Sequence, residues 1–257
     1  LRRYSTAGWA FLTGDVEHIT RLCQLCHSVG VWCRLSRQVA LVAHAFGVDQ
    51  ARMPPWLHST LNIAIALAEL GGTIYGGPLV LGDRVVQGSY AGSLVALSLS
   101  SHAPLWTATG LGKLHGSPVA APDGQTVYVA SRDGSVRSLS METGQAHWRV
   151  QTGDELWAAP VLDPDGNLYI GGFDGSVRSL TPSGALRWST AVGGAVRADV
   201  TLDPDQGLLW VATDAGDVIS LRLDGTERWR TKVGAPILGP RPTLTPEGVV
   251  VVGTPVS

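Results

Sequence analysis

The sequence DGSVRSL occupies Asp133–Leu139 and occurs again, unchanged, at Asp174–Leu180. A tryptophan follows each copy within nine residues, Trp148 after the first and Trp188 after the second. Both features belong to longer rows of repeated residues. The tryptophans lie 42, 40 and 41 residues apart, at Trp106, Trp148, Trp188 and Trp229. The turn glycines lie 42, 41 and 41 residues apart, at Gly92, Gly134, Gly175 and Gly216. A shared period near 41 indicates an internal repeat that starts near residue 71.

Each unit alternates short β-forming segments with turn residues. In the third unit we expect strands over 159–162, 167–171, 176–180 and 185–190. Turn residues arrive too often for helices, and no helical stripe of apolar residues is present, which excludes a repeat of helix pairs. The Asp-Gly pairs predict two-residue type I′ hairpin turns, with positive φ at both central residues. Four short antiparallel strands in about 40 residues are typical of a propeller blade.

The recurring tryptophan has a physical explanation in such a fold. It comes near the end of each unit, so we expect it on the outermost strand, where a large flat side chain fills the gap between adjacent sheets. Stacking against a ligand is the alternative role.

The end of each unit repeats one spacing of a turn glycine, a tryptophan and a second glycine. The three sets are Gly144, Trp148 and Gly153, then Gly184, Trp188 and Gly193, then Gly225, Trp229 and Gly234. This spacing resembles the tryptophan-docking repeat of the pyrroloquinoline-quinone-like (PQQ-like) propellers. The first unit departs from it, with Ser101-His102 in place of Thr-Gly. The resemblance implies an all-β propeller of four-stranded antiparallel blades. We expect blades at 71–111, 112–153, 154–193 and 194–234 and part of a fifth at 235–257, an incomplete ring.

The PQQ-like family contains both enzymes and cofactor-free binding platforms. Its quinoprotein dehydrogenases need a Glu, an Asn and a catalytic Asp around calcium and quinone, with an adjacent cysteine pair. The repeats here contain no cysteine, and their acidic residues fall mostly in turns, where aspartate bonds the local backbone. The Asp-Pro-Asp segments at 163–165 and 203–205 do not supply the oxygen ligands that calcium needs. We therefore assign no catalytic, cofactor-binding or metal-binding residue.

The resemblance favours a non-catalytic scaffold that binds a protein or glycan partner on one propeller face. The family's binding platforms include a lipoprotein of outer-membrane assembly, which implies a periplasmic or cell-envelope location. Two alternatives stay open. One is a fragment of a PQQ-dependent dehydrogenase, and the other is an accessory domain of an adenylate-forming enzyme or a kinase.

Two further groups of residues could belong to a binding face. Asp154, Glu155 and Trp157 precede a blade, near the place where a ligand face would form, although no base or nucleophile accompanies them. Arginines occupy equivalent positions in neighbouring blades, as Arg137 with Arg178 and as Arg187 with Arg228. Such rows could bind an acidic partner. We expect instead that these arginines are the solvent-facing residues of strands whose side chains alternate between core and solvent.

Residues 1–70 lack the repeat pattern, and parts of them, 15–29 and 59–70, have helical spacing. They contain the sequence Cys-x-x-Cys-His at Cys23, Cys26 and His27, the spacing that attaches c-type haem. Met53 would then resemble the second axial ligand of a small cytochrome c. A zinc site and purely structural cysteines are the alternatives.

The composition excludes several other classes of protein. Hydrophobic residues make up 44% of the 257 residues and charged ones 16%, which excludes a disordered chain. A net charge of −2 provides no basic footprint for nucleic acid. No apolar run reaches the roughly 20 residues of a membrane-spanning helix. Because the sequence starts at Leu1 rather than Met, we expect a fragment or a processed chain.

Overall fold

The computed structural model describes residues 72–101, 103–238, 241–245 and 248–254, and these residues form strands and turns without a helix. The first sheet comprises β1 (Leu79–Leu81), β2 (Arg84–Gly88), β3 (Leu94–Ser98) and β4 (Pro104–Ala108). The second comprises β5 (Val119–Ala120), β6 (Thr126–Ala130), β7 (Ser135–Ser140) and β8 (Ala146–Gln151). The third comprises β9 (Val161–Leu162), β10 (Leu168–Gly171), β11 (Ser176–Leu180) and β12 (Leu186–Ala191). The fourth comprises β13 (Thr201–Asp203), β14 (Leu208–Ala212), β15 (Asp217–Arg222) and β16 (Glu227–Lys232), and β17 (Thr243–Leu244) pairs with β18 (Val250–Val251).

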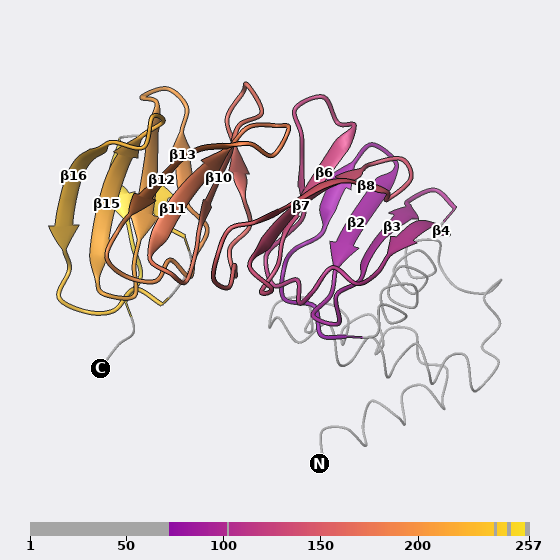
Figure 1. The fold of residues 1–257 in the computed structure, drawn as a ribbon, viewed down its shortest axis with the longest axis horizontal. Helices are drawn as coiled ribbons and strands as arrows, with labels where there is room; N and C mark the ends of the chain where they lie inside the picture. The colour runs from indigo at the N-terminus through magenta and orange to yellow at the C-terminus, as the bar shows by residue number, and fades with distance from the viewer. Residues whose placement is uncertain (1–71, 102, 239–240, 246–247, 255–257) are drawn as a thin grey trace, which may run out of the picture.

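The four-stranded sheets are antiparallel and stand side by side in chain order (Figure 1). Their first strands approach one another, since β1 contacts β5 and β13 contacts both β9 and β17. The first strand of each sheet is therefore the innermost and the fourth is the outermost. This arrangement around a common axis confirms the predicted fold class, a β-propeller of four-stranded blades.

The hydrophobic core lies between neighbouring sheets. One buried cluster combines Val86 and Leu94 of the first sheet with Val127 and Leu139 of the second. Two further clusters join the second sheet to the third and the third to the fourth in the same way. The two middle strands of each blade are largely buried, because flanking strands cover their edges and neighbouring sheets cover their faces. Each blade is thus stabilised chiefly by the next blade, as in other repeat proteins.

The recurring tryptophans dock on the next blade, as expected. Their indole N–H groups donate to backbone carbonyls there, Trp106 to Met141 at 3.0 Å, Trp148 to Pro182 at 3.0 Å and Trp188 to Leu223 at 2.8 Å. The indole also covers the neighbouring turn glycine. A methyl group added at Gly225 would lie 2.6 Å from Cδ2 of Trp188, so only glycine fits this turn. Trp229, on the outermost strand of the fourth sheet, is 46% exposed.

The hairpin between the two middle strands differs from the predicted type I′ turn. In the second sheet Ser131 N–H donates to Ser135 O, and Gly134 N–H donates to Ser131 O. This is a three-residue loop, Arg132 to Gly134, in which the glycine takes a positive φ of 77°. The first, third and fourth sheets repeat the pattern. We call these the middle hairpin loops.

Several expectations fall on residues 1–71, outside the described residues. They are the helical segments and the haem or zinc motif at Cys23, Cys26 and His27. Among the residues that are described, none belongs to a helix with the length and apolarity that a membrane crossing requires.

Candidate functional site

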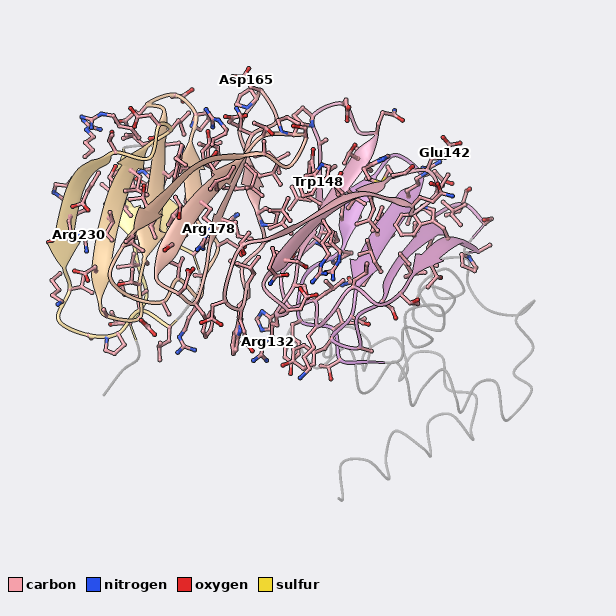
Figure 2. All side chains as sticks on the ribbon, viewed as in Figure 1. Arg132, Glu142, Trp148, Asp165, Arg178 and Arg230 are labelled. Carbon is pink, nitrogen blue, oxygen red and sulfur yellow. The ribbon has the colours of Figure 1, made fainter. Side chains whose placement is uncertain are left out.

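The middle hairpin loops and the connections between blades lie at the same end of the molecule. Figure 2 shows Arg132, in one of these loops, at the lower edge, opposite Asp165. Backbone hydrogen bonds clamp each connection between two blades. In the first connection, Leu111 and Leu114 donate to Gly92 and Ser89 of the first blade, while Arg132 of the second donates to Lys113. The same contacts recur at the next two connections, so the loops form a rigid surface.

Residues 113–115, 155–157 and 195–197 of the connections contain no turn or bend, and their side chains alternate between the core and the surface. Leu114, Leu156 and Val196 hold equivalent positions and are buried at 2%, 1% and 0% exposure. Because neighbouring side chains of an extended segment point in opposite directions, the flanking residues face outward. These residues are Lys113, His115, Glu155, Trp157, Ala195 and Arg197.

A continuous line of rings crosses these loops. Tyr75 stacks on His115 with ring centroids 4.8 Å apart, and His115 lies 5.0 Å from Trp157. Trp157 in turn lies 4.7 Å from Phe173. Tyr90 meets Tyr75 edge-on at 5.2 Å. With Arg132 and Arg197, these rings form what we call the aromatic–arginine surface.

Arg132 is held in place from several sides. Its Nε and Nη2 groups donate to both carboxylate oxygens of Glu155 at 2.6–2.9 Å. Its guanidinium carbon lies 4.4 Å from the centroid of Trp157 and 5.5 Å from that of Tyr90, whose hydroxyl it also contacts. A bidentate ion pair combined with ring stacking fixes a guanidinium well.

Arg197 lies in the connection between the third and fourth blades, at the position that Trp157 holds in the preceding connection. Its guanidinium carbon lies 4.7 Å from the ring centroid of Phe173 and 5.8 Å from that of Trp157. Its Nη2 lies 3.3 Å from Oδ2 of Asp214, in the middle hairpin loop of the fourth blade. Each arginine is thus placed by an acidic residue and by rings from two blades.

The ion pair of Arg132 and Glu155 keeps both of its charges near neutral pH. The Trp157 indole N–H donates to Glu155 at 2.7 Å and holds the pKa of Glu155 below its usual value, and Arg132 adds to this effect. Partial burial acts to lower the pKa of Arg132, but its bonds to Glu155 outweigh burial and raise it. The surface presents fixed rings and fixed charges, which suit binding.

Sequence reasoning found this surface only in part. Glu155 and Trp157 belong to it, as their place before a blade suggested, and they meet Arg132 from another loop. The first residue of each middle hairpin loop is different in every blade, so the repeat rows did not single it out. These residues are Tyr90, Arg132, Phe173 and Asp214, two positions before the turn glycines.

The prediction of solvent-facing side chains is wrong for one row of arginines and is confirmed for the other. Arg137 is buried and pairs with Asp133 at 2.6 Å, and Arg178 pairs with Asp174 in the same way. Each arginine reaches back to the turn aspartate of its own hairpin, so these two do not form a recognition stripe. Arg187 and Arg228 are both exposed, as predicted, and Arg187 also donates to Tyr169 and Ser179 at 3.0 Å.

The acidic turns do not assemble a metal centre in the described part of the chain, where no three His, Cys, Asp or Glu side chains gather. Asp163, in the first Asp-Pro-Asp segment, instead accepts hydrogen bonds from Asn167 and Tyr169. The assignment of no catalytic, cofactor-binding or metal-binding residue stays a prediction.

The blades and the docked tryptophans define the class of the protein, a β-propeller of PQQ-like repeats. A family model described as "Outer membrane protein assembly factor BamB" matches residues 54–194 and 173–255. The chain belongs to this family, which confirms the resemblance seen in the sequence.

Similar proteins carry the same description. BamB of Burkholderia pseudomallei (strain K96243) is 40% identical over 95 residues, which are 36% of this chain and 24% of that protein. BamB of Taylorella asinigenitalis (strain MCE3) is 31% identical over 128 residues, 47% of this chain and 31% of that protein. The match therefore spans less than a third of either relative. The crystal structure of BamB from Moraxella catarrhalis has a TM-score of 0.56 at 22% identity, covering 66% of this chain and 52% of that one, and it shares the fold.

These comparisons support the non-catalytic scaffold expected from the sequence and give no support to a quinoprotein dehydrogenase. The alternative of an accessory domain in an adenylate-forming enzyme or a kinase stays a prediction.

Proposed function

We propose that the protein is a non-catalytic scaffold of the periplasm that takes part in the assembly of outer membrane proteins. We place its protein-binding site at the aromatic–arginine surface. The observation that carries the proposal is the composition of that surface. Trp, Tyr and Arg are the residues in which binding energy concentrates at protein interfaces, and here they lie in clamped loops. Because the side chains are already ordered, binding costs little conformational entropy.

The packing of Trp157 favours a protein partner over a glycan. Two rings and two guanidinium groups already lie against its indole. A sugar would need an open aromatic face to stack on, whereas a protein can contact the exposed edges of the rings and the charged groups beside them. The names of the relatives support a role in outer membrane protein assembly.

The proposal is tested by placing a photo-crosslinking amino acid at one of two equally accessible positions in the cell. Tyr75 is 57% exposed on the surface, and Leu186 is 60% exposed on β12. We expect crosslinks from position 75 to a component or client of outer membrane protein assembly, and none from position 186. Equal crosslinking from both positions would contradict the proposed site.

A second experiment measures function in a strain that lacks the gene. The Arg132→Ala, Trp157→Ala double variant should fail to restore outer membrane protein levels, whereas Arg149→Ala should restore them. Arg149 is a matched control, because its side chain is 54% exposed on β8. Circular dichroism and protein level must show that both variants are folded. Full rescue by the folded double variant would overturn the proposal.

A further inference from the structure

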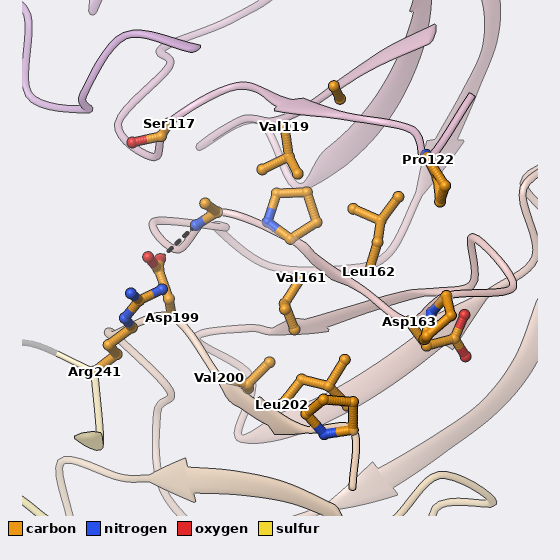
Figure 3. Close-up of a pocket in the computed structure, with 15 residues that line it drawn as sticks. Ser117, Val119, Pro122, Val161, Leu162, Asp163, Asp199, Val200, Leu202 and Arg241 are labelled. Atoms are coloured by element: carbon orange, nitrogen blue, oxygen red, sulfur yellow. Dashed lines mark hydrogen bonds between the residues drawn. The ribbon is translucent and has the colours of Figure 1, made fainter. Parts of the chain in front are cut away.

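A cavity of about 590 Å³ lies along the inner strands of the second, third and fourth blades (Figure 3). Its volume is in the range of sites for small ligands. The walls are mostly apolar, with Val119 on β5, Val161 on β9, and Val200 and Leu202 beside or on β13. This cavity is distinct in composition from the aromatic–arginine surface.

The backbone around the cavity is poorly suited to adding another strand. β5, β9 and β13 each have a single neighbour in their sheets, so one edge of each strand is left without a sheet partner. Pro122, Pro164 and Pro204 follow these three strands and line the cavity. Proline has no N–H to donate, which prevents regular strand pairing there. A ligand must therefore be recognised by side chains and by shape.

Polar groups gather at one end of the cavity. Asp199 and Arg241 occupy equivalent positions in successive repeats, and Figure 3 shows them side by side, far from Asp163 at the other end. Oδ1 of Asp199 accepts a hydrogen bond from Ala159 N–H at 2.6 Å. Burial raises the pKa of Asp199, while the Ala159 bond and the charges of Arg241 and His115 act in the opposite direction. The end thus offers one acceptor group and one cationic donor group.

We propose that this cavity binds a short, apolar, uncharged peptide segment of a partner protein. Because Asp199 and Arg241 lie side by side with opposite charges, the polar end has no net charge, and a charged ligand would gain at one group what it loses at the other. A peptide amide matches both groups, because its N–H can donate to the carboxylate and its carbonyl can accept from the guanidinium. Aliphatic side chains of the segment would fill the space between the valines and Leu202.

This inference deepens the proposed function and rests on it, because it names the chemistry of a protein partner. The two can nevertheless fail separately. Crosslinking and rescue in cells test the aromatic–arginine surface, whereas the cavity is tested with the purified chain and a defined peptide.

The probe is N-acetyl-Leu-Leu-amide, titrated into the purified full chain with methyl NMR as the readout. We expect saturable shifts of the methyl groups of Val161, Val200 and Leu202. Arg241→Ala should weaken binding about tenfold, as expected for loss of a hydrogen bond to a charged group. Arg228→Ala, a matched change at another exposed arginine, should leave the affinity unchanged.

Two further measurements complete the test. Val161→Phe narrows the cavity and should abolish binding of the dipeptide. If that variant does not fold, the comparison of Arg241→Ala with Arg228→Ala tests the proposal by itself. The same dipeptide with a free carboxylate should bind several-fold more weakly than the blocked form. Equal affinity of the Arg241→Ala and Arg228→Ala variants for the blocked dipeptide would overturn the proposal and indicate an unselective apolar crevice.

Discussion

Asp163 shows how a single buried carboxylate organises a turn. Only 6% exposed, it accepts hydrogen bonds from Asn167 N–H at 2.8 Å, from Asn167 Nδ2 at 2.9 Å and from the Tyr169 hydroxyl at 2.8 Å. Burial by itself would raise the pKa of Asp163, but these hydrogen bonds outweigh burial and lower it below 3.8. Burial, followed by the bond to Asp163, raises the pKa of Tyr169 to about 12. The carboxylate is therefore used structurally.

Replacing this carboxylate should change how stability depends on pH. Because its pKa is lowered by folding, Asp163 stabilises the native state above its unfolded pKa of 3.8, and this contribution is lost as the pH falls through the lower folded value. We expect Asp163→Asn to cost about 1–3 kcal/mol at pH 7, the cost of unmatched buried groups. Urea unfolding at pH 7, 4 and 3 should show a flatter acid dependence for the variant.

The exposed neighbour provides the control for this measurement. Asp165→Asn changes a carboxylate in the same turn that is open to solvent, so its stability should follow the wild type at each pH. Parallel curves for wild type and Asp163→Asn would contradict the role assigned to Asp163.

At the scale of the elements, the outermost strand of one blade and the turn of the next form a docking unit. The indole N–H of Trp148, on β8, donates to Pro182 O at 3.0 Å, and the ring centroids of Trp148 and Tyr128 lie 5.7 Å apart. Gly184 has no side chain and leaves space for the indole. Trp229 on β16 has the same place in its blade but is 46% exposed. The same residue type therefore has two different environments in one chain.

This difference predicts unequal costs for the same substitution. Trp148→Ala should destabilise the protein by about 3–5 kcal/mol, because it removes a docked aromatic and leaves a cavity between two blades. Trp229→Ala should cost about 1 kcal/mol or less, in the range of surface changes. Urea unfolding followed by circular dichroism measures both, and similar losses for the two variants would show that docking is not what stabilises Trp148.

At the scale of the whole molecule, the blades form a linear series of neighbours. Three hydrophobic clusters and three docked tryptophans each join one blade to the next. In such arrays stability is close to a sum of terms for the units and for their interfaces. A local defect should therefore weaken the blades nearest to it most.

Hydrogen exchange can detect this gradient. Trp148→Ala cuts the contact between the second and third blades, so amide exchange should rise most in β5–β8 and β9–β12 and least in β13–β16. Mass spectrometry of peptic fragments measures the rates blade by blade. A uniform increase over all four sheets would mean that the chain unfolds as one cooperative unit, contrary to this prediction.

Much of the fold could be predicted because the repeat records a local pattern. In the third blade the predicted strand over 176–180 agrees with β11, Ser176–Leu180, whereas the predicted 159–162 shortens to β9, Val161–Leu162. The predicted hairpin type was wrong, because Ser135 pairs with Ser131 and not with Arg132, which makes the loop one residue longer, and the other blades do the same. The alternation of apolar residues in the strands does not distinguish a two-residue loop from a three-residue loop.

The sequence by itself determined the blade, since alternating apolar residues, turn glycines and one tryptophan per unit are read within about 41 residues. Only the tertiary structure decided which side chains meet at the end of the molecule. Arg132 and Glu155 lie 23 residues apart, and His115 and Trp157, whose ring centroids are 5.0 Å apart, lie in different connections, so no pattern within one repeat links them. They come together because each connection is clamped between two blades. That spacing is set by packing between sheets, which no single repeat encodes.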